Sequence, residues 1–108
     1  MACVSRIDSI RKLLAGSPDD VFLLYGLGME LLGAGRPAEA AESFRRVLEL
    51  DGKYLAAYTQ AAKALQQAGD RSGAASLLRR GLAVADQADD RHTKERLALQ
   101  LAGLGERI

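Results

Sequence analysis

The residue types that most often carry catalysis or bind metals are scarce in this chain of 108 residues. It contains one histidine, His92, and one cysteine, Cys3, and they lie far apart in the sequence. A cysteine nucleophile needs a base close to it, and a structural zinc site needs about four ligands. We therefore expect no catalytic residue, no metal site and no cofactor, and we predict that the protein is not an enzyme.

Two pairs of carboxylates, Asp19-Asp20 and Asp89-Asp90, are the remaining groups that suggest acid–base chemistry. Each pair stands where a helical pattern begins, and a carboxylate there accepts hydrogen bonds from open backbone N–H groups and stabilises the helix dipole. We interpret both pairs as helix caps. The glycines of "YGLGMELLGAGRP" lack the preceding strand and the lysine of a phosphate-binding loop.

The elements that position these residues are all predicted to be helices. Ala, Leu, Arg, Glu and Gln dominate the chain, whereas Gly and Pro fall at its breaks. Five breaks separate six segments, and the short connections between them require antiparallel neighbours. The predicted helices cover residues 5–15, 19–32, 38–50, 54–68, 72–85 and 90–104.

The chain also repeats itself. "GRPAEAAESFRRVLEL", which begins at Gly35, returns in altered form as "GDRSGAASLLRRGLAV" from Gly69, an offset of 34 (69 − 35). A period of this size indicates a stack of helical units in one domain, 1–108. We divide it into a half repeat (1–20), two units (21–54 and 55–88) and a C-terminal capping helix (89–108), because His92, Glu95 and Arg96 interrupt the repeated pattern.

Small and bulky residues recur at fixed places in these units. The first helices carry Leu24, Leu27, Gly28 and Leu31, then Tyr58, Ala61, Ala62 and Leu65; the second helices pair Ala40 with Phe44 and Ala74 with Leu78. This pattern resembles the tetratricopeptide repeat family, although Trp is missing and Gly52 and Asp86 replace the proline between repeats. The resemblance implies an all-α fold of antiparallel helix-turn-helix repeats, stacked as a short right-handed solenoid of about six helices.

The resemblance also implies binding on the concave surface formed by the first helix of each unit. Once the packing residues are set aside, the helix over 19–32 keeps a second apolar stripe, and the next unit offers a more polar one. The predicted protein-binding residues are Phe22, Tyr25, Met29, Leu32, Thr59, Lys63 and Gln66. Two other interpretations of the stripe stay open, because the chain's own terminal helix or a second copy of the chain would also cover it.

Composition narrows the class of partner. Fifteen basic against fourteen acidic residues leave a net charge of +1, which provides no bulk attraction for nucleic acid or an anionic membrane. The most apolar stretch, 21–32, contains Glu30 and is about 12 residues long, where a bilayer needs roughly 20. The start "MACVSRIDSI" lacks the apolar run of a secretion signal. We expect a cytoplasmic protein with no nucleic-acid or membrane partner.

Basic pairs recur at Arg11-Lys12, Arg45-Arg46 and Arg79-Arg80, and acidic neighbours favour a salt-bridged, solvated face over a nucleic-acid strip. One subtype of the family clamps the C-terminal carboxylate of chaperone tails with Lys, Arg and Asn, but this chain contains no Asn. The predicted function is therefore a scaffold or adaptor module that binds a peptide or helix of another protein in the concave groove. The alternative is a structural homodimer that uses the same apolar surface, and the sequence does not identify the partner.

Overall fold

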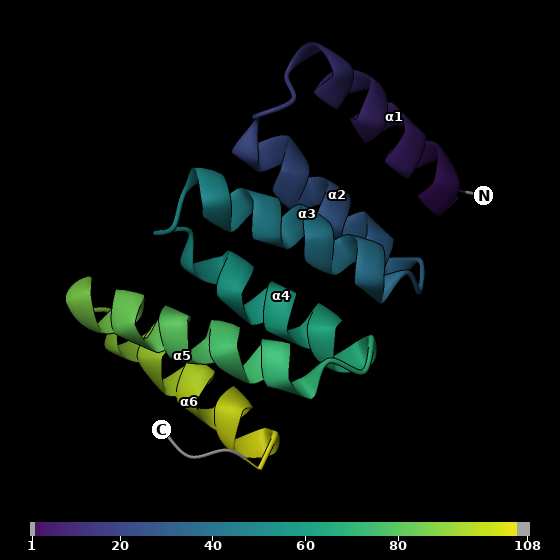
Figure 1. Cartoon of the computed structure of the whole chain (residues 1–108). Helices are drawn as coiled ribbons and strands as arrows, with labels where there is room; N and C mark the ends of the chain where they lie inside the picture. Colours follow the sequence, from purple (N-terminus) through teal and green to yellow (C-terminus); the bar gives the residue numbers. More distant parts are fainter. Residues whose placement is uncertain (1, 106–108) are drawn as a thin grey trace.

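The computed structural model describes residues 2–105, with side chains from Arg6 to Gly105, and this part of the chain forms six helices and no strand (Figure 1). The side chain of Cys3, considered above as a nucleophile, lies outside the described residues. The all-α prediction and the number of helices are confirmed, with ends that differ by at most three residues from those expected. The helices are α1 (Ala2–Gly16), α2 (Val21–Gly33), α3 (Pro37–Leu50), α4 (Leu55–Gln67), α5 (Arg71–Gln87) and α6 (Arg91–Gly103).

The helices stack in chain order, and each packs against the next as an antiparallel neighbour (Figure 1). In addition, α2 contacts α4 and α4 contacts α6. Among the described residues, α1, α3 and α5 make no such contacts with one another. The molecule therefore has an inner layer of α2, α4 and α6, whose helices approach one another, and an outer layer of α1, α3 and α5. We call the exposed side of the inner layer the inner face.

Aspartates cap three of the helices. The Asp20 carboxylate accepts a hydrogen bond from the Leu23 amide at 3.1 Å, and Asp90 accepts one from the Thr93 amide at 3.0 Å. These contacts confirm the capping interpretation for one member of each predicted pair. Asp70 caps α5 in the same way, through the Gly73 amide at 2.8 Å. Each cap satisfies an otherwise open N–H group and so stabilises the start of its helix.

The turns within the repeats end the first helices with a residue in the left-handed conformation. Gly35 has φ +75° and Gly69 has φ +88°, values that side chains other than glycine rarely tolerate. At the corner between α5 and α6 the same conformation is adopted by Asp89, with φ 56°. Asp is among the few residues that enter this region, so the α5–α6 connection closes without a glycine.

The core interlocks small and large side chains, as the repeat pattern predicts. Ala40 and Ala74 are fully buried, and the Phe44 ring lies directly over Gly28. A Cβ atom added at Gly28 would lie 2.5 Å from Phe44 Cε1, so the close approach of α2 and α3 requires glycine there. The other residues of the repeated pattern are also buried: Leu24, Leu27, Leu31, Tyr58, Ala61, Ala62, Leu65 and Leu78. Leu48 and Leu82, one turn beyond Phe44 and Leu78, are buried with them.

Leucine in place of Ala40 or Ala74 is expected to overpack a helix crossing and to lower the free energy of unfolding by about 1–3 kcal/mol. Ala38, which is exposed on α3, gives the matched control, since Ala38→Leu adds the same atoms to solvent. Thermal melts of the three variants measure whether only the two buried substitutions lower the melting midpoint. Unchanged midpoints for both buried variants would show that these alanines are not contact points.

Candidate functional site

The inner face begins with α2, whose sequence carries a single charged side chain, Glu30. Phe22 is 80% exposed and Met29 is 40% exposed, so α6 does not cover these two residues. Tyr25 and Leu32 are half-buried and pack against the hydrophobic core. The predicted apolar stripe is therefore open to solvent at two of its four residues and continuous with the core at the other two.

Tyr25 connects this stripe to the next unit. Its ring meets Phe44 edge-on at a centroid distance of 5.5 Å and lies 5.1 Å from the ring of Tyr54, the residue that precedes α4. Burial raises the pKa of the Tyr25 hydroxyl, Tyr54 raises it further, and the nearby guanidinium of Arg96 opposes the rise. The group stays a neutral phenol at physiological pH, with its hydroxyl able to donate a hydrogen bond.

A hollow of about 220 Å³ lies where α2, α4 and α6 meet, and it brings two predicted site residues, Tyr25 and Thr59, together. It is lined by Tyr25, Ala56, Thr59, Gln60, Thr93 and Arg96. The Gln100 side chain donates to the Thr59 carbonyl at 3.0 Å and so ties α6 to α4 beside it. The hollow is smaller than the roughly 300–1,000 Å³ of small-molecule pockets, so it fits one side chain of a larger ligand.

The remaining predicted residues, Lys63 and Gln66, are exposed on α4. Lys63 is the ninth residue of α4, as Met29 is the ninth residue of α2. Equal places in parallel, neighbouring helices present side chains on the same side of a layer. The structure thus aligns Lys63 with Met29 on the inner face.

The position of the last helix, α6, differs from the register that the 34-residue repeat predicts. The starts of α4 and α6 are offset by 36 (91 − 55), whereas the starts of α2 and α4 are offset by 34 (55 − 21). The difference of two arises because α5 has 17 residues and α3 has 14, while the connection after α5 (88–90) is one residue shorter than the connection after α3 (51–54). With this shift, Leu97, Ala98 and Leu101 repeat the Leu-small-Leu pattern of the first helices. The interruption expected at His92, Glu95 and Arg96 is therefore wrong: it came from applying the shorter period to a unit that is longer.

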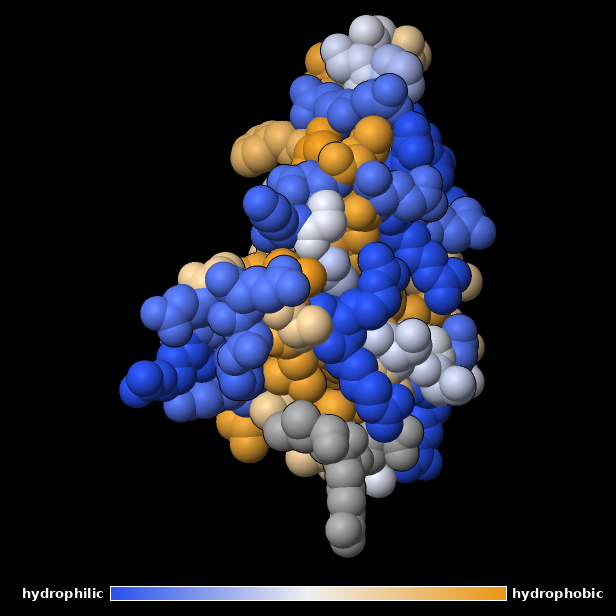
Figure 2. All heavy atoms as spheres, turned by 60° about the vertical axis from the view of Figure 1, so that its left-hand side comes forward, coloured by the Kyte–Doolittle hydropathy of each residue, from blue (hydrophilic) through white to orange (hydrophobic). Residues whose placement is uncertain are grey.

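Because of this register error, Leu99 was not among the predicted binding residues. It is the ninth residue of α6, equivalent to Met29 and Lys63, and its side chain is 73% exposed. Counting from the Asp90 cap places Leu99, but the sequence does not show which of Asp86, Asp89 and Asp90 is the cap. Figure 2 shows a broken band of apolar side chains, bordered by polar ones, on the side where α2, α4 and α6 begin.

A family model described as tetratricopeptide repeat matches residues 31–96, which is more than half of the chain. The chain belongs to the tetratricopeptide repeat family. The "TPR repeat-containing protein PA0015" of Pseudomonas aeruginosa is 37% identical over 98 residues, which cover 91% of this chain and 93% of that protein.

Solved structures with the same fold extend the comparison of this tetratricopeptide repeat protein. PcrH, solved in complex with the chaperone binding region of PopD, superposes with a TM-score of 0.82 at 21% identity, over 92% of this chain and 75% of that one. The type III secretion translocator chaperone SycD of Yersinia enterocolitica gives 0.81 at 20% identity, over 92% and 69%. Protein BPP2914 of Bordetella parapertussis gives 0.78 at 28% identity, over 92% and 86%. Family and neighbours support a protein-interaction module.

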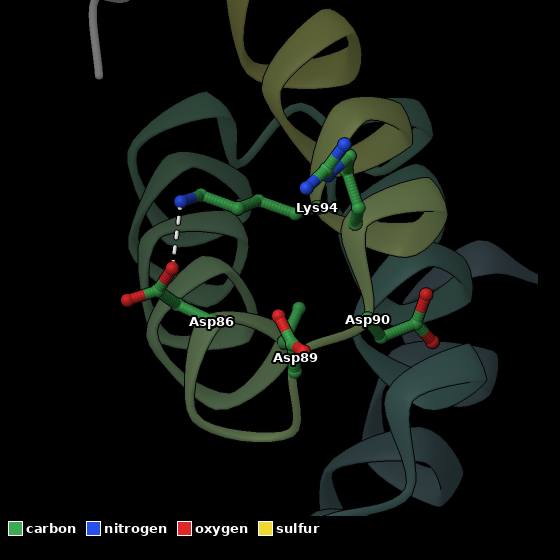
Figure 3. Close-up of a pocket in the computed structure, with 6 residues that line it drawn as sticks. Asp86, Asp89, Asp90 and Lys94 are labelled. Atoms are coloured by element: carbon green, nitrogen blue, oxygen red, sulfur yellow. Dashed lines mark hydrogen bonds and ion pairs between the residues drawn. The ribbon is translucent and has the colours of Figure 1, made fainter.

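The acidic corner of the tetratricopeptide repeat stack, between α5 and α6, does not gather into a metal site. In Figure 3 the Asp86 carboxylate points to Lys94, 2.7 Å away, whereas the Asp90 side chain points away from it. The backbone and side-chain hydrogen bonds from Thr93 lower the pKa of Asp90. No group of three ligating side chains that could hold a metal occurs among residues described by the structure. His92 is exposed at the start of α6.

Arginines of the outer tetratricopeptide helices contact groups of the chain itself. Arg46 pairs with Asp19 at 2.7 Å, Arg45 lies 3.9 Å from Asp70, and the Arg80 guanidinium lies 5.8 Å from the Tyr58 ring centroid. These contacts favour the salt-bridged interpretation of the outer face. Within the part of the chain that the structure describes, no helix is long and apolar enough to cross a membrane.

Proposed function

We propose that this chain binds a peptide segment or helix of another protein along its inner face. The apolar end of the site consists of Phe22, Tyr25, Met29 and Leu32, and the polar part consists of Thr59, Lys63 and Gln66. The observation that carries the proposal is the exposure of Phe22 and Met29 on a helix with one charged residue. Large apolar side chains left in water beside one another are typical of protein interfaces.

The residue types on α2 suit this role. Phe and Tyr supply rigid contact area, and Met adapts its shape to a partner, which is why all three are enriched in interface cores. Phe22 and Met29 lie seven residues apart, which is two turns along one side of α2. Tyr25 stands between them with its body held by Phe44 and Tyr54. A partner would therefore meet a partly preorganised apolar surface.

The structural neighbours provide independent support. PcrH, which shares this fold over 92% of the chain, was solved with a bound region of PopD. SycD is named as a translocator chaperone. A stack with this fold therefore holds a protein segment in PcrH, and we extend that mode of binding to this chain as part of the proposal.

Replacing Phe22 and Met29 together by alanine is expected to weaken binding by about 2 kcal/mol or more, because a few apolar anchors carry most interface energy. Both side chains are exposed, so the free energy of unfolding should change little. Tyr25 is left intact because its contacts with Phe44 and Tyr54 contribute to the fold. Binding is measured by titration against peptides selected from a displayed random library.

The matched control is Leu13→Ala with Leu50→Ala, which removes two other exposed apolar side chains from α1 and α3. This control should bind the selected peptides as the original protein does. Light scattering across concentrations distinguishes the alternative function. A dimer that dissociates when Phe22 and Met29 are replaced, with no peptide selected, would establish self-association in place of peptide binding.

A further inference from the structure

One row of the inner face alternates in chemical character. Met29, Lys63 and Leu99 occupy the ninth positions of α2, α4 and α6, and all three are exposed. A ligand that crosses the three helices therefore meets an apolar side chain, then a cation, then a second apolar side chain. Phe22, two turns from Met29, enlarges the first apolar position.

The cationic centre includes a second group, Arg96, which lines the hollow beside Tyr25 and Gln60. Neither Lys63 nor Arg96 forms an ion pair with another described residue. Lys94 of α6 differs in this respect, because it is bound to Asp86 at 2.7 Å. The centre of the inner face thus carries two cations that are available to a partner.

Acidic side chains are nearly absent from this part of the surface. The sequence of α4 contains none. On α2, Glu30 lies 3.6 Å from Arg6 of α1. On α6, Glu95 is exposed one turn before Leu99 and about 140° around the helix from Gln100, the residue that contacts α4, so it lies on the side of Leu99 away from α4. Lys63 and Arg96 against this one carboxylate leave the local charge positive, although the net charge of the chain is only +1.

We propose that the segment bound on the inner face carries aspartate or glutamate between two apolar residues. One apolar residue packs on Phe22 and Met29, the other packs on Leu99, and the carboxylates face Lys63 and Arg96. This inference rests on the proposed function and specifies the chemistry of its partner. The carboxylates belong to side chains within the segment, because the cations lie between the two apolar positions.

The spacing of the helices sets the spacing of the anchors. Packed helices lie about 8–10 Å apart, so α2 and α6 are separated by roughly 16–20 Å. An extended chain advances about 3.3 Å per residue. The two apolar residues of an extended ligand are therefore about five or six residues apart, with the acidic residues between them.

The test uses three pools of peptides with both ends blocked, so that no terminal carboxylate contributes. Each pool has two leucines five or six residues apart, randomised flanking residues, and either glutamate, glutamine or lysine between the leucines. Fluorescence anisotropy should show that the glutamate pool binds about tenfold more tightly than the glutamine pool, and that the lysine pool binds most weakly. The advantage of glutamate should shrink as salt is added.

Charge reversal provides the decisive variant. Lys63→Glu with Arg96→Glu should remove the preference for glutamate and give the advantage to the lysine pool. Both side chains are exposed, and circular dichroism checks that the fold is retained. Arg11→Glu with Lys12→Glu on α1 makes the same change in net charge away from the inner face and should leave the order of the pools unaltered.

The possible results separate the two proposals. Equal binding of the glutamate and glutamine pools would overturn the acidic-ligand inference and leave the proposed function standing. An order of pools that survives the reversal of Lys63 and Arg96 would also overturn it. No binding by any pool at about 1 mM would overturn both proposals together.

Discussion

Phe44→Ala is expected to lower the free energy of unfolding by about 3–5 kcal/mol, which is most of the stability of a small domain. The ring has no exposed surface and meets Tyr25 edge-on while it covers Gly28. Because Gly28 has no side chain, nothing on α2 fills the space that the ring would leave. Urea unfolding followed by circular dichroism measures the change.

The matched control for this prediction is Phe22→Ala, which removes the same atoms from a side chain that is 80% exposed. Its free energy of unfolding should stay within about 0.5 kcal/mol of the original value. A loss as large as that of Phe44→Ala would contradict the placement of Phe22 in solvent. It would show that Phe22 is covered in solution, as the homodimer alternative requires.

The fold follows from local signals that the sequence displays twice. Gly35 and Gly69 stand one repeat apart and both adopt the left-handed conformation that ends a helix. Ala40 and Ala74 are separated by the same offset (74 − 40 = 69 − 35), and both are fully buried. Such residues act through backbone conformation and steric size, which depend on residue type alone. This is why helix positions and core residues were predicted well.

The register of α6 depends on a feature that residue type does not reveal. α5 continues to Gln87, and the chain then turns at Asp89 with φ 56°, so the connection has no glycine to mark its place. Asp86, Asp89 and Asp90 look alike in the sequence, yet they form an ion pair, a left-handed turn and a helix cap respectively. The position of Leu99 on the inner face could not be read before these roles were known.

Within the candidate site, the sequence could predict only those residues whose exposure to solvent follows from the periodicity of a single helix. Phe22 and Met29 are open because they lie opposite the packing residues of α2, as helical periodicity predicts. Tyr25 is held by Tyr54, which lies beyond the whole of α3 in the sequence, and is influenced by Arg96 near the far end of the chain. Contacts across such separations depend on the stacking of units, and periodicity within a single helix carries no information on them.

Deletion of residues 1–16 is expected to cause aggregation or to abolish cooperative unfolding. This removes α1, whose Ile7 is buried and whose Arg6 contacts Glu30, while the Ile10 side chain lies close to Gly26. In a helical repeat stack each unit is stabilised by its neighbours, so the loss of an end helix exposes the apolar side of the next one.

The effect should be severe here because α2 already exposes Phe22 and Met29 on its other side and carries only Glu30 as a charged residue. Without α1 this helix would present apolar surface to water on two sides. Light scattering and a thermal melt of the truncated protein test the expectation. The point variants Ile7→Ala, which is buried, and Leu13→Ala, which is exposed on the same helix, separate packing from helix propensity, and only the first should lower the melting midpoint. A truncated chain that stays monomeric and melts like the original would show that α1 does not stabilise the stack. Helices α2–α6 would then be sufficient to maintain the inner face.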